Sequence, residues 1–300
     1  MITIKTPATS ANLGPGFDCL GLALGLYDQF TVAPAAVSRL ENVEPRFSGP
    51  DNLFLKAYGK ASQALGLATG ICVRFDCLIP SSRGLGSSAA LSAAGLTAAW
   101  LLAGRTPDRS MMLRMATELE GHPDNAAPCL LGGLTAVLAD ADGTPLVRQL
   151  PIDGGLMTTA LIPDVEVPTA QARALLPDSY PRPVAAANAA MAVMLTAALA
   201  AGDMALLKAA ARDRLHEPYR QQLIPGFAEL KRRAEKDTDG VMVISGSGSS
   251  CLLFSRRPLS GPAVEAIQAG DGPHWTVMPL PVAHQGIQYK EDSATWRTIF

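Results

Sequence analysis

No excess of charge of either sign marks this sequence. Its 25 lysine and arginine residues stand against 27 aspartate and glutamate residues, which gives a formal net charge of −2. Proteins that bind nucleic acids usually carry a basic excess or a basic stripe. The balanced composition therefore argues against nucleic acid as a partner.

The sequence shows no cysteine-pair spacing and no strongly apolar run, and we expect no leader segment. The five cysteines are widely spread and show neither Cys-x-x-Cys pairs nor a Cys/His metal spacing, so we expect buried, reduced thiols. The first residues, MITIKTPATSANLG, lack the charged-then-apolar build of a signal peptide. Residues Val184 to Ala201 are mostly alanine, which contributes little to membrane partitioning. We interpret this stretch as a buried helix, and we expect a cytoplasmic protein without a membrane partner.

The order of patterned stretches predicts an α+β protein. Its 300 residues suffice for one large domain or two of ordinary size, and they contain no internal repeat. A loop-rich stretch, Asp140 to Gly155, is the best candidate for a domain boundary, so we divide the chain into residues 1–152 and 153–300. Alternation and helical patterning predict strands at residues 2–5, 71–79, 133–139, 157–162, 241–245, 251–255 and 275–280, and helices at residues 87–102, 109–120, 184–201, 203–215 and 225–236.

The most informative segment is IPSSRGLGSSAA, residues 79–90, in which a strand runs through a glycine-rich turn into a helix. Gly84 and Gly86 permit positive φ and a close approach of the backbone to a ligand. The free N–H groups at the start of the helix form an anion site, to which Ser87 and Ser88 add hydroxyls. No lysine follows Gly86, which excludes a Walker loop, and the third glycine of a dinucleotide fingerprint is missing. The alternative is an ordinary glycine turn in which Ser87 caps the helix.

Three segments, in order along the chain, resemble those of one enzyme superfamily. PSSRGLGSSAA at residues 80–90 resembles the central motif of the GHMP kinases. PATSANLGPGFD at residues 7–18 and EGHPDN at residues 120–125 resemble the homoserine kinase branch of that superfamily. The similarity extends over almost the whole chain, which makes it far more specific than a single glycine loop.

The resemblance implies ATP-dependent phosphorylation of the side-chain hydroxyl of L-homoserine to O-phospho-L-homoserine, a step of threonine biosynthesis, with ATP and Mg²⁺ as cofactors. It also implies a two-lobed α+β fold with the site between the lobes. The N-terminal lobe would be ribosomal-protein-S5-domain-2-like, with a left-handed β-α-β crossover, and the C-terminal lobe ferredoxin-like. Relatives are often dimers, which leaves a homodimer open here. The ATP contacts implied are Pro80, Ser82, Arg83, Gly84, Leu85, Gly86, Ser87, Ser88 and Ala89, with Asn52 on the adenine side.

A carboxylate for the metal is expected at the end of the helix before the polar turn. In the family a glutamate at the position of Glu120 works with a serine of the glycine loop, which maps to Ser88 or its neighbour Ser87. Magnesium prefers hard oxygen ligands and takes few of them from protein. A negative charge at a helix C-terminus is unfavourable, which favours a functional reason for Glu120 over a merely solvated one. Glu118 is the weaker alternative.

The residue expected beside the reacting hydroxyl is Asn125. Related mevalonate and galactose kinases carry an aspartate there as a base, whereas the homoserine branch, like this sequence, has asparagine. An amide can orient a hydroxyl but cannot act as a general base. We therefore expect direct in-line attack on the γ-phosphorus, with the proton leaving late to phosphate oxygen or solvent. The neighbouring Asp124 is an alternative base.

Homoserine is a zwitterion, so its site needs an anion for the ammonium and cations for the carboxylate. Asp18 and Asn12 are implied on the ammonium side, although both residue types are common in plain glycine turns. VPTAQAR at residues 167–173 and HEPYR at residues 216–220 resemble the family's carboxylate-binding segments, although arginines are most often exposed surface residues. The expected substrate-binding set is Asn12, Asp18, His122, Asp124, Asn125, Thr169, Arg173 and Arg220.

Two features leave the specificity open. The glycine segment ISGSGSS, residues 244–250, resembles the family's C-terminal motif but has Ser247 and Ser249 where alanine and proline are usual. We expect the reaction to be unchanged and the substrate fit to be open to change. The alternatives are therefore a GHMP-type kinase of another small amino alcohol, and a non-catalytic nucleotide-sensing relative that keeps the fold.

Overall fold

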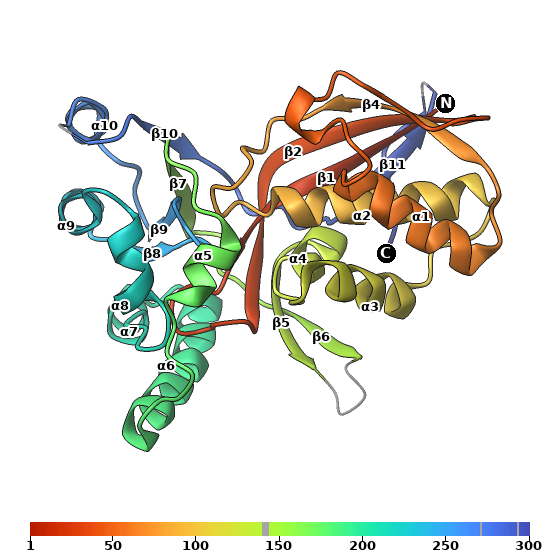
Figure 1. Ribbon diagram of the computed structural model, residues 1–300. Coiled ribbons are helices and arrows are strands. Elements are labelled where there is room, and N and C mark those ends of the chain that lie inside the picture. The colour runs from red at the N-terminus through yellow and green to blue at the C-terminus, as the bar shows by residue number, and fades with distance from the viewer. Residues whose placement is uncertain (140–143, 271, 293) are drawn as a thin grey trace.

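The computed structural model describes residues 1–139, 144–270, 272–292 and 294–300. They form two lobes side by side, each built on its own sheet (Figure 1). The sheet of the first lobe is mostly antiparallel, with one parallel pair between β3 and β4. Its strands are β1 (Ile2–Ala11), β2 (Leu20–Ala35), β3 (Arg39–Glu41), β4 (Gly70–Asp76), β5 (Leu134–Ala139), β6 (Pro145–Leu150), β11 (Gln288–Glu291) and β12 (Arg297–Thr298).

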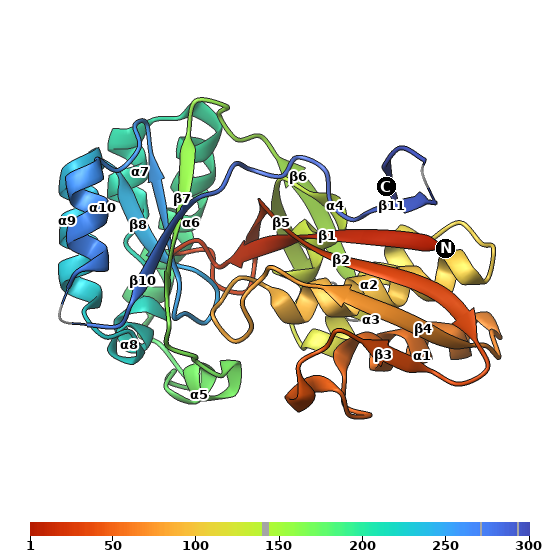
Figure 2. The same cartoon turned by 90° about the horizontal axis from the view of Figure 1, so that it is seen from above.

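Helices of the first lobe cover one face of this sheet (Figure 2). The central one, α2 (Ser87–Leu102), has the predicted bounds and is mostly buried, because its alanines let sheet and helices approach closely. A Cβ at Gly95 would lie 2.2 Å from the carbonyl oxygen of Phe54, so only glycine lets α1 pack this close. The other helices are η1 (Pro45–Phe47), α1 (Leu53–Leu65), α3 (Arg109–Glu120), which also has the predicted bounds, and α4 (Ala126–Leu131).

The sheet of the second lobe is antiparallel in the order β10-β7-β9-β8. The first and last strands of the lobe are thus neighbours, and each half contributes helices between its strands. This βαββαβ arrangement is ferredoxin-like, as predicted. The strands are β7 (Met157–Pro163), β8 (Val241–Ile244), β9 (Cys251–Ser255) and β10 (Trp275–Pro279); the helices are α5 (Thr169–Ala174), α6 (Arg182–Ala201), α7 (Met204–Ala210), α8 (Glu217–Arg220), η2 (Gln221–Leu223), α9 (Phe227–Thr238) and α10 (Gly261–Gln268).

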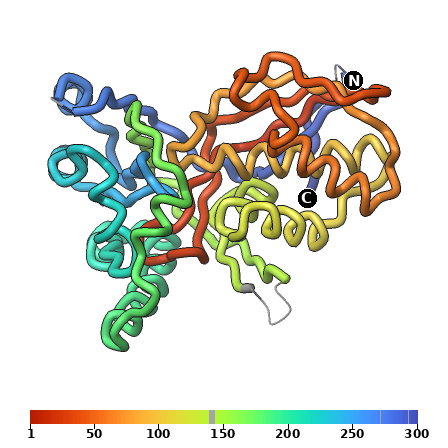
Figure 3. Tube along the Cα trace, in the orientation of Figure 1, coloured from red at the N-terminus to blue at the C-terminus, as the bar shows by residue number. Residues whose placement is uncertain are grey.

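The end of the chain returns to the first lobe. β11 pairs with β1, β12 pairs with β11, and both termini lie in that lobe (Figure 3). Our division placed residues 153–300 together in the second lobe, whereas β11 and β12 belong to the sheet of the first lobe. These strands are short and polar, so they carry no alternating apolar pattern. The boundary near residue 152 stays a prediction. β6 was missed because it lies within the stretch that we interpreted as loop, and residues 140–143 of that stretch lie outside the described part.

The alanine-rich helix α6 is not the buried helix that we predicted. Only Asn188, Leu195, Ala198 and Leu199 are buried, and Val193 is 67% exposed. By length and composition alone α6 could cross a membrane, but this is weak evidence, because the core helix of a soluble protein passes the same test. Asn188 fixes α6 to the rest of the protein, because its side chain donates to the carbonyl of Pro15 (2.9 Å) and accepts from the N–H of Arg214 (3.0 Å).

The cysteines are free thiols, but they are not uniformly buried. Cys129 and Cys251 are buried as predicted, whereas Cys77 is exposed and Cys19 and Cys72 are partly exposed. The prediction of reduced thiols is confirmed, and that of general burial is wrong for these three.

Candidate active site

The glycine-rich turn before α2 lies where the two lobes meet. Gly84 and Gly86 both have φ of +71°. A Cβ at Gly84 would lie 2.1 Å from the carbonyl oxygen of Ser245 in the second lobe, and one at Gly86 would lie 1.9 Å from Oγ1 of Thr9 on β1. Neither position therefore accommodates a side chain without displacing the loop.

The first turn of α2 keeps its amides free. The residue before the helix is Gly86, and among the described residues no side chain caps the helix start. The alternative in which Ser87 acts as the capping residue is therefore wrong. Uncapped N–H groups together with the positive end of the helix dipole are suited to hold a phosphate.

Two adjoining cavities meet at this turn. The smaller, of about 240 Å³, lies between the lobes, and the larger, of about 870 Å³, extends along the first lobe past Phe47 and Leu78. Predicted residues that line the smaller cavity are Asn12, Asp18, Pro80, Ser82, Arg83, Gly84, Leu85, Gly86, Ser87, Ser88, Glu120, His122, Asp124, Asn125, Thr169, Arg173 and Arg220. The structure thus brings together residues from both ends of the chain.

Two described residues of the predicted set lie elsewhere. Ala89 is buried inside α2, one residue beyond the lining. Asn52 lines the larger cavity, where its side chain accepts from the N–H of Leu55 (3.2 Å) and donates to the carbonyl of Phe47 (2.9 Å). Asn52 caps α1, so it shapes the wall of that cavity.

A carboxylate and a hydroxyl meet at the edge of the turn. Ser88 donates to Oε1 of Glu120 at 2.7 Å, and Ser92, one helical turn later, donates to the same atom at 2.9 Å. Glu118 lies elsewhere on α3 and forms an ion pair with Lys60 at 2.6 Å. Among the described residues no group of three or more His, Cys, Asp or Glu side chains could hold a metal ion. One carboxylate beside one hydroxyl nevertheless suits Mg²⁺, which keeps most of its ligands from water and phosphate.

The side chain of Asn125 is oriented by a residue that sequence reasoning missed. Thr9 on β1 donates its hydroxyl to Oδ1 of Asn125 at 2.7 Å. This hydrogen bond fixes the orientation of the amide, whose N–H groups can then donate to a ligand. Asn125 can therefore donate to a substrate oxygen but cannot accept its proton.

The adjacent turn holds a histidine–aspartate pair. Nδ1 of His122 lies 2.5 Å from Oδ1 of Asp124, whose side chain is buried. Burial opposes the charged imidazole, but the hydrogen bond and the negative charge of Asp124 outweigh it, so that the pKa of His122 is raised. A raised pKa means that His122 keeps its proton to a higher pH than an ordinary histidine does.

Opposite charges expected to bind the two ends of a zwitterion lie together across the lobe boundary. Arg173 donates to both carboxylate oxygens of Asp18, at 2.7 and 3.1 Å. Arg220 is 2% exposed and donates to the carbonyl of Gly246 at 3.0 Å. The two guanidinium groups lie 5.7 and 5.2 Å from the ring of Phe17. Burial, together with the charge of Arg173, lowers the pKa of Arg220.

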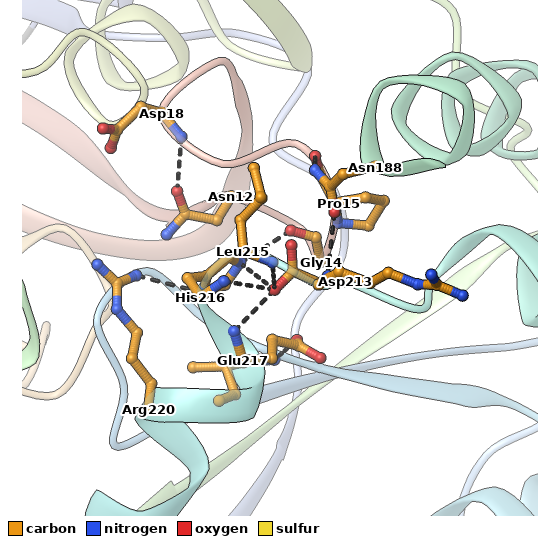
Figure 4. Close-up of polar contacts among 12 residues, drawn as sticks. Asn12, Gly14, Pro15, Asp18, Asn188, Asp213, Leu215, His216, Glu217 and Arg220 are labelled. Atoms are coloured by element: carbon orange, nitrogen blue, oxygen red, sulfur yellow. Dashed lines mark hydrogen bonds and ion pairs between the residues drawn. The ribbon is translucent and has the colours of Figure 1, made fainter. Parts of the chain in front are cut away.

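Asn12 and Thr169 line the same cavity in different ways. Asn12 accepts from the N–H of Asp18 at 2.9 Å (Figure 4). It also donates to the carbonyl of Gly246 at 2.8 Å, so both ends of its amide are engaged. Oγ1 of Thr169 lies 3.5 Å from Oγ of Ser247. The serine that departs from the family's usual pattern thus faces the substrate-side cavity.

Comparison with known proteins identifies the class and then the family. Residues 52–133 match the model of the GHMP kinase N-terminal domain and residues 195–269 that of the C-terminal domain, so the two lobes and the amide-lined turn are those of a GHMP kinase. Homoserine kinase of Synechococcus is 37% identical over 97% of this chain and 99% of its own, and that of Thermus thermophilus is 38% identical over 96% and 98%. The crystal structure of homoserine kinase from Cytophaga hutchinsonii matches with a TM-score of 0.84 at 30% identity, covering 96% of this chain and 97% of that one. The chain belongs to the homoserine kinase family.

Beside the buried arginine lies a carboxyl group with an unusual titration. Burial raises the pKa of Glu217 from its ordinary 4.5 to about 7, although the N–H of Ile244, 2.6 Å from Oε1, opposes the shift. Because the folded pKa exceeds the unfolded one, this group stabilises the fold fully below pH 4.5, and the contribution is lost as the pH rises through 7. Glutamine does not titrate, so the free energy of unfolding of Glu217→Gln should rise relative to that of wild type as the pH is raised from 4.5 to above 7, by up to about 3 kcal/mol.

Urea unfolding at pH 5, 6, 7 and 8 measures this difference. Glu229→Gln is the control, because hydrogen bonds from Arg232 and Arg233 lower the pKa of Glu229 to about 2 and keep it ionised throughout. Its difference from wild type should be constant with pH. A constant difference for Glu217→Gln as well would contradict the assignment.

Proposed function

We propose that this chain transfers the γ-phosphoryl group of ATP to the side-chain hydroxyl of L-homoserine, giving O-phospho-L-homoserine for threonine biosynthesis. The observation that carries the proposal is a single cavity with two chemistries. Free amides at the start of α2 and the Ser88–Glu120 pair lie on one side, and Asp18, Arg173 and Arg220 lie on the other. The homoserine kinases of Synechococcus and Thermus thermophilus support the choice of substrate.

ATP would extend from the turn into the larger cavity, which adjoins the smaller one at Ser82, Arg83, Ser87 and Ser88. Its phosphates would face the amides of α2. A magnesium ion held by the Glu120 carboxylate and the Ser88 hydroxyl would supply positive charge to the phosphate oxygens. His122 lines the same cavity and would add to that charge when its imidazole is protonated.

The acceptor hydroxyl would attack without a dedicated base. Asn125, held by Thr9, donates to the hydroxyl oxygen and orients it, while Asp124 is engaged with His122. The proton leaves late, to a phosphate oxygen or to solvent, because the transition state of phosphoryl transfer requires little early deprotonation.

This account predicts a ranking of two neighbouring substitutions. Asn125→Ala should lower kcat at least tenfold, since the hydroxyl loses its orienting donor. Asp124→Asn should have the smaller effect, because the amide oxygen still accepts from His122. Rates at saturating ATP and homoserine measure both. Loss of all chemistry in Asp124→Asn, with little change in Asn125→Ala, would establish Asp124 as the base.

A substrate panel tests the function itself. ATP consumption is measured with L-homoserine, L-serine, L-threonine and mevalonate, and L-homoserine should have the highest kcat/KM. Preference for another compound of the panel would indicate a kinase of a related alcohol and would point to Ser247, which lines the cavity. Calorimetric binding of Mg·ATP without turnover of any compound would indicate a nucleotide-sensing protein.

We also propose a cytoplasmic homodimer without nucleic-acid or membrane partners. The exposed apolar face of α6, with Val193 67% and Met194 45% exposed, is the support for self-association. Light scattering after gel filtration should give twice the chain mass for the wild type and a smaller mass for Val193→Glu. A monomer in the wild type would refute the dimer.

A further inference from the structure

A buried imidazole lies directly behind the arginine expected to bind the substrate carboxylate. His216, just before α8, is 0% exposed. Its Nε2 lies 2.8 Å from the carbonyl oxygen of Gly14, and its Nδ1 lies 3.4 Å from Nη1 of Arg220 (Figure 4). A carbonyl can only accept, so Nε2 carries the hydrogen, and Nδ1 is left as an acceptor for the guanidinium.

The surroundings hold this ring in one place and one charge state. Oδ2 of Asp213 accepts from the backbone N–H groups of residues 215, 216 and 217, which fixes the turn that carries the ring. The ring stacks on Phe17 with centroids 5.3 Å apart. Burial lowers the pKa of His216, more than the charge of Asp213 raises it, so the imidazole is neutral and its Nδ1 stays an acceptor.

Arg220 needs such a partner. It is a long side chain, its Nε has no hydrogen-bond partner within the described residues, and the nearby charge of Arg173 repels it. The carbonyl of Gly246 and the imidazole of His216 both bind the same nitrogen, Nη1. With that nitrogen fixed, the other end of the guanidinium faces the cavity. The side chain of Arg220 then loses less conformational entropy when a carboxylate binds.

We propose that His216 is a positioning residue for the amino-acid substrate, whose neutral ring aims Arg220 into the cavity and holds the loop that carries Asp18. One side chain thereby sets the distance between the cationic and the anionic halves of the zwitterion site. The inference rests on the proposed function, because it names the element that presents this site to its substrate.

Three substitutions of His216 separate its two nitrogens. Asparagine places an acceptor near the position of Nδ1 and cannot reach Gly14, whereas glutamine places a donor near Nε2 and leaves Arg220 without its acceptor. Phenylalanine keeps the stack on Phe17 and loses both contacts. We expect KM for L-homoserine to rise about tenfold in His216→Phe and His216→Gln and less than threefold in His216→Asn, with KM for ATP within about twofold of wild type in all three.

A merely structural histidine would give a different result. Loss of packing would scale with the loss of thermal stability and raise both KM values together. The variant Leu230→Ala, which removes a buried side chain from α9, measures that general effect. Equal KM values for L-homoserine in the asparagine and glutamine variants would refute the role of Nδ1. If the phenylalanine variant does not fold, the comparison of His216→Asn with His216→Gln is sufficient to test the role of Nδ1.

The double variant with Arg220→Lys shows whether His216 acts through the arginine. If it does, adding His216→Gln to Arg220→Lys raises KM for L-homoserine no further, whereas independent effects would multiply. Multiplication of the two effects overturns the proposal. The wild-type rate with L-homoserine is measured first: no turnover refutes the proposed function and with it the substrate named here, whereas turnover with unchanged KM in His216→Gln refutes the role of His216 alone.

Discussion

Glu120→Gln is expected to lower kcat by a factor of roughly 10² to 10³, the range found when one group that stabilises transition-state charge is removed. The glutamine oxygen can still accept from Ser88 and Ser92, so the local fold is retained. The substitution removes only the negative charge that would hold a magnesium ion at the start of α2. The deficit should therefore shrink as the Mg²⁺ concentration is raised, because weak binding is restored by mass action.

Glu118→Gln is the matched control on the same helix. Glu118 is half-exposed and pairs with Lys60, away from the cavity, so its loss should leave kcat within about twofold. Rates over a series of Mg²⁺ concentrations, with thermal unfolding to verify the fold, measure both variants. Similar rates for Glu118→Gln and Glu120→Gln would contradict the assignment of Glu120 as the metal ligand.

The elements that the sequence predicted best have the strongest local signals. α2 and α3 begin and end at the predicted residues, since glycines and a proline flank their helical patterns. The strand β11 gave no signal because it is short and polar, and no local pattern reveals its pairing with β1, almost 300 positions away. The error at α6 has another cause: apolar composition measures how readily a helix is buried, but it does not say whether a partner element covers it.

Within the candidate site, the motif residues could be predicted from the sequence. The residues that hydrogen-bond to them and orient them could not. The motifs located Asn125, Glu120 and Arg220, but their roles remain proposals. Thr9, which orients Asn125, is 116 residues away from it in the chain, and no local pattern links the two. His216 stood in the HEPYR segment that was recognised for its arginine, so a signal existed there. Its contact with Gly14 depends on the fold, which brings together residues 202 positions apart, whereas its contact with Arg220 is local, four positions along the chain.

Arg220→Lys is expected to raise KM for L-homoserine by about two orders of magnitude and to leave KM for ATP nearly unchanged. Lysine has no planar fork, so it cannot bind Gly246 on one side and a carboxylate bidentately on the other. The arginine is also buried, so water cannot replace the lost contacts. Arg173→Lys should raise the same KM by a smaller factor, because Arg173 is 39% exposed and can be replaced in part by solvent.

The ratio of the two rises in KM for L-homoserine shows which arginine contributes more to substrate binding. Arg173 is paired with Asp18 before any ligand binds, so a zwitterion must exchange that contact for its own two charges, and the net gain is small. Arg173 repels Arg220, and the charges of Asp18, Asp124 and Asp213 attract it from a distance. Among the described residues its hydrogen bonds go to the neutral partners Gly246 and His216, so a carboxylate would be its first hydrogen-bonded counter-charge. Initial rates over a grid of ATP and L-homoserine concentrations separate the two KM values. A larger effect of Arg173→Lys, or an equal rise of both KM values in Arg220→Lys, would show that the buried arginine supports the fold and not the substrate.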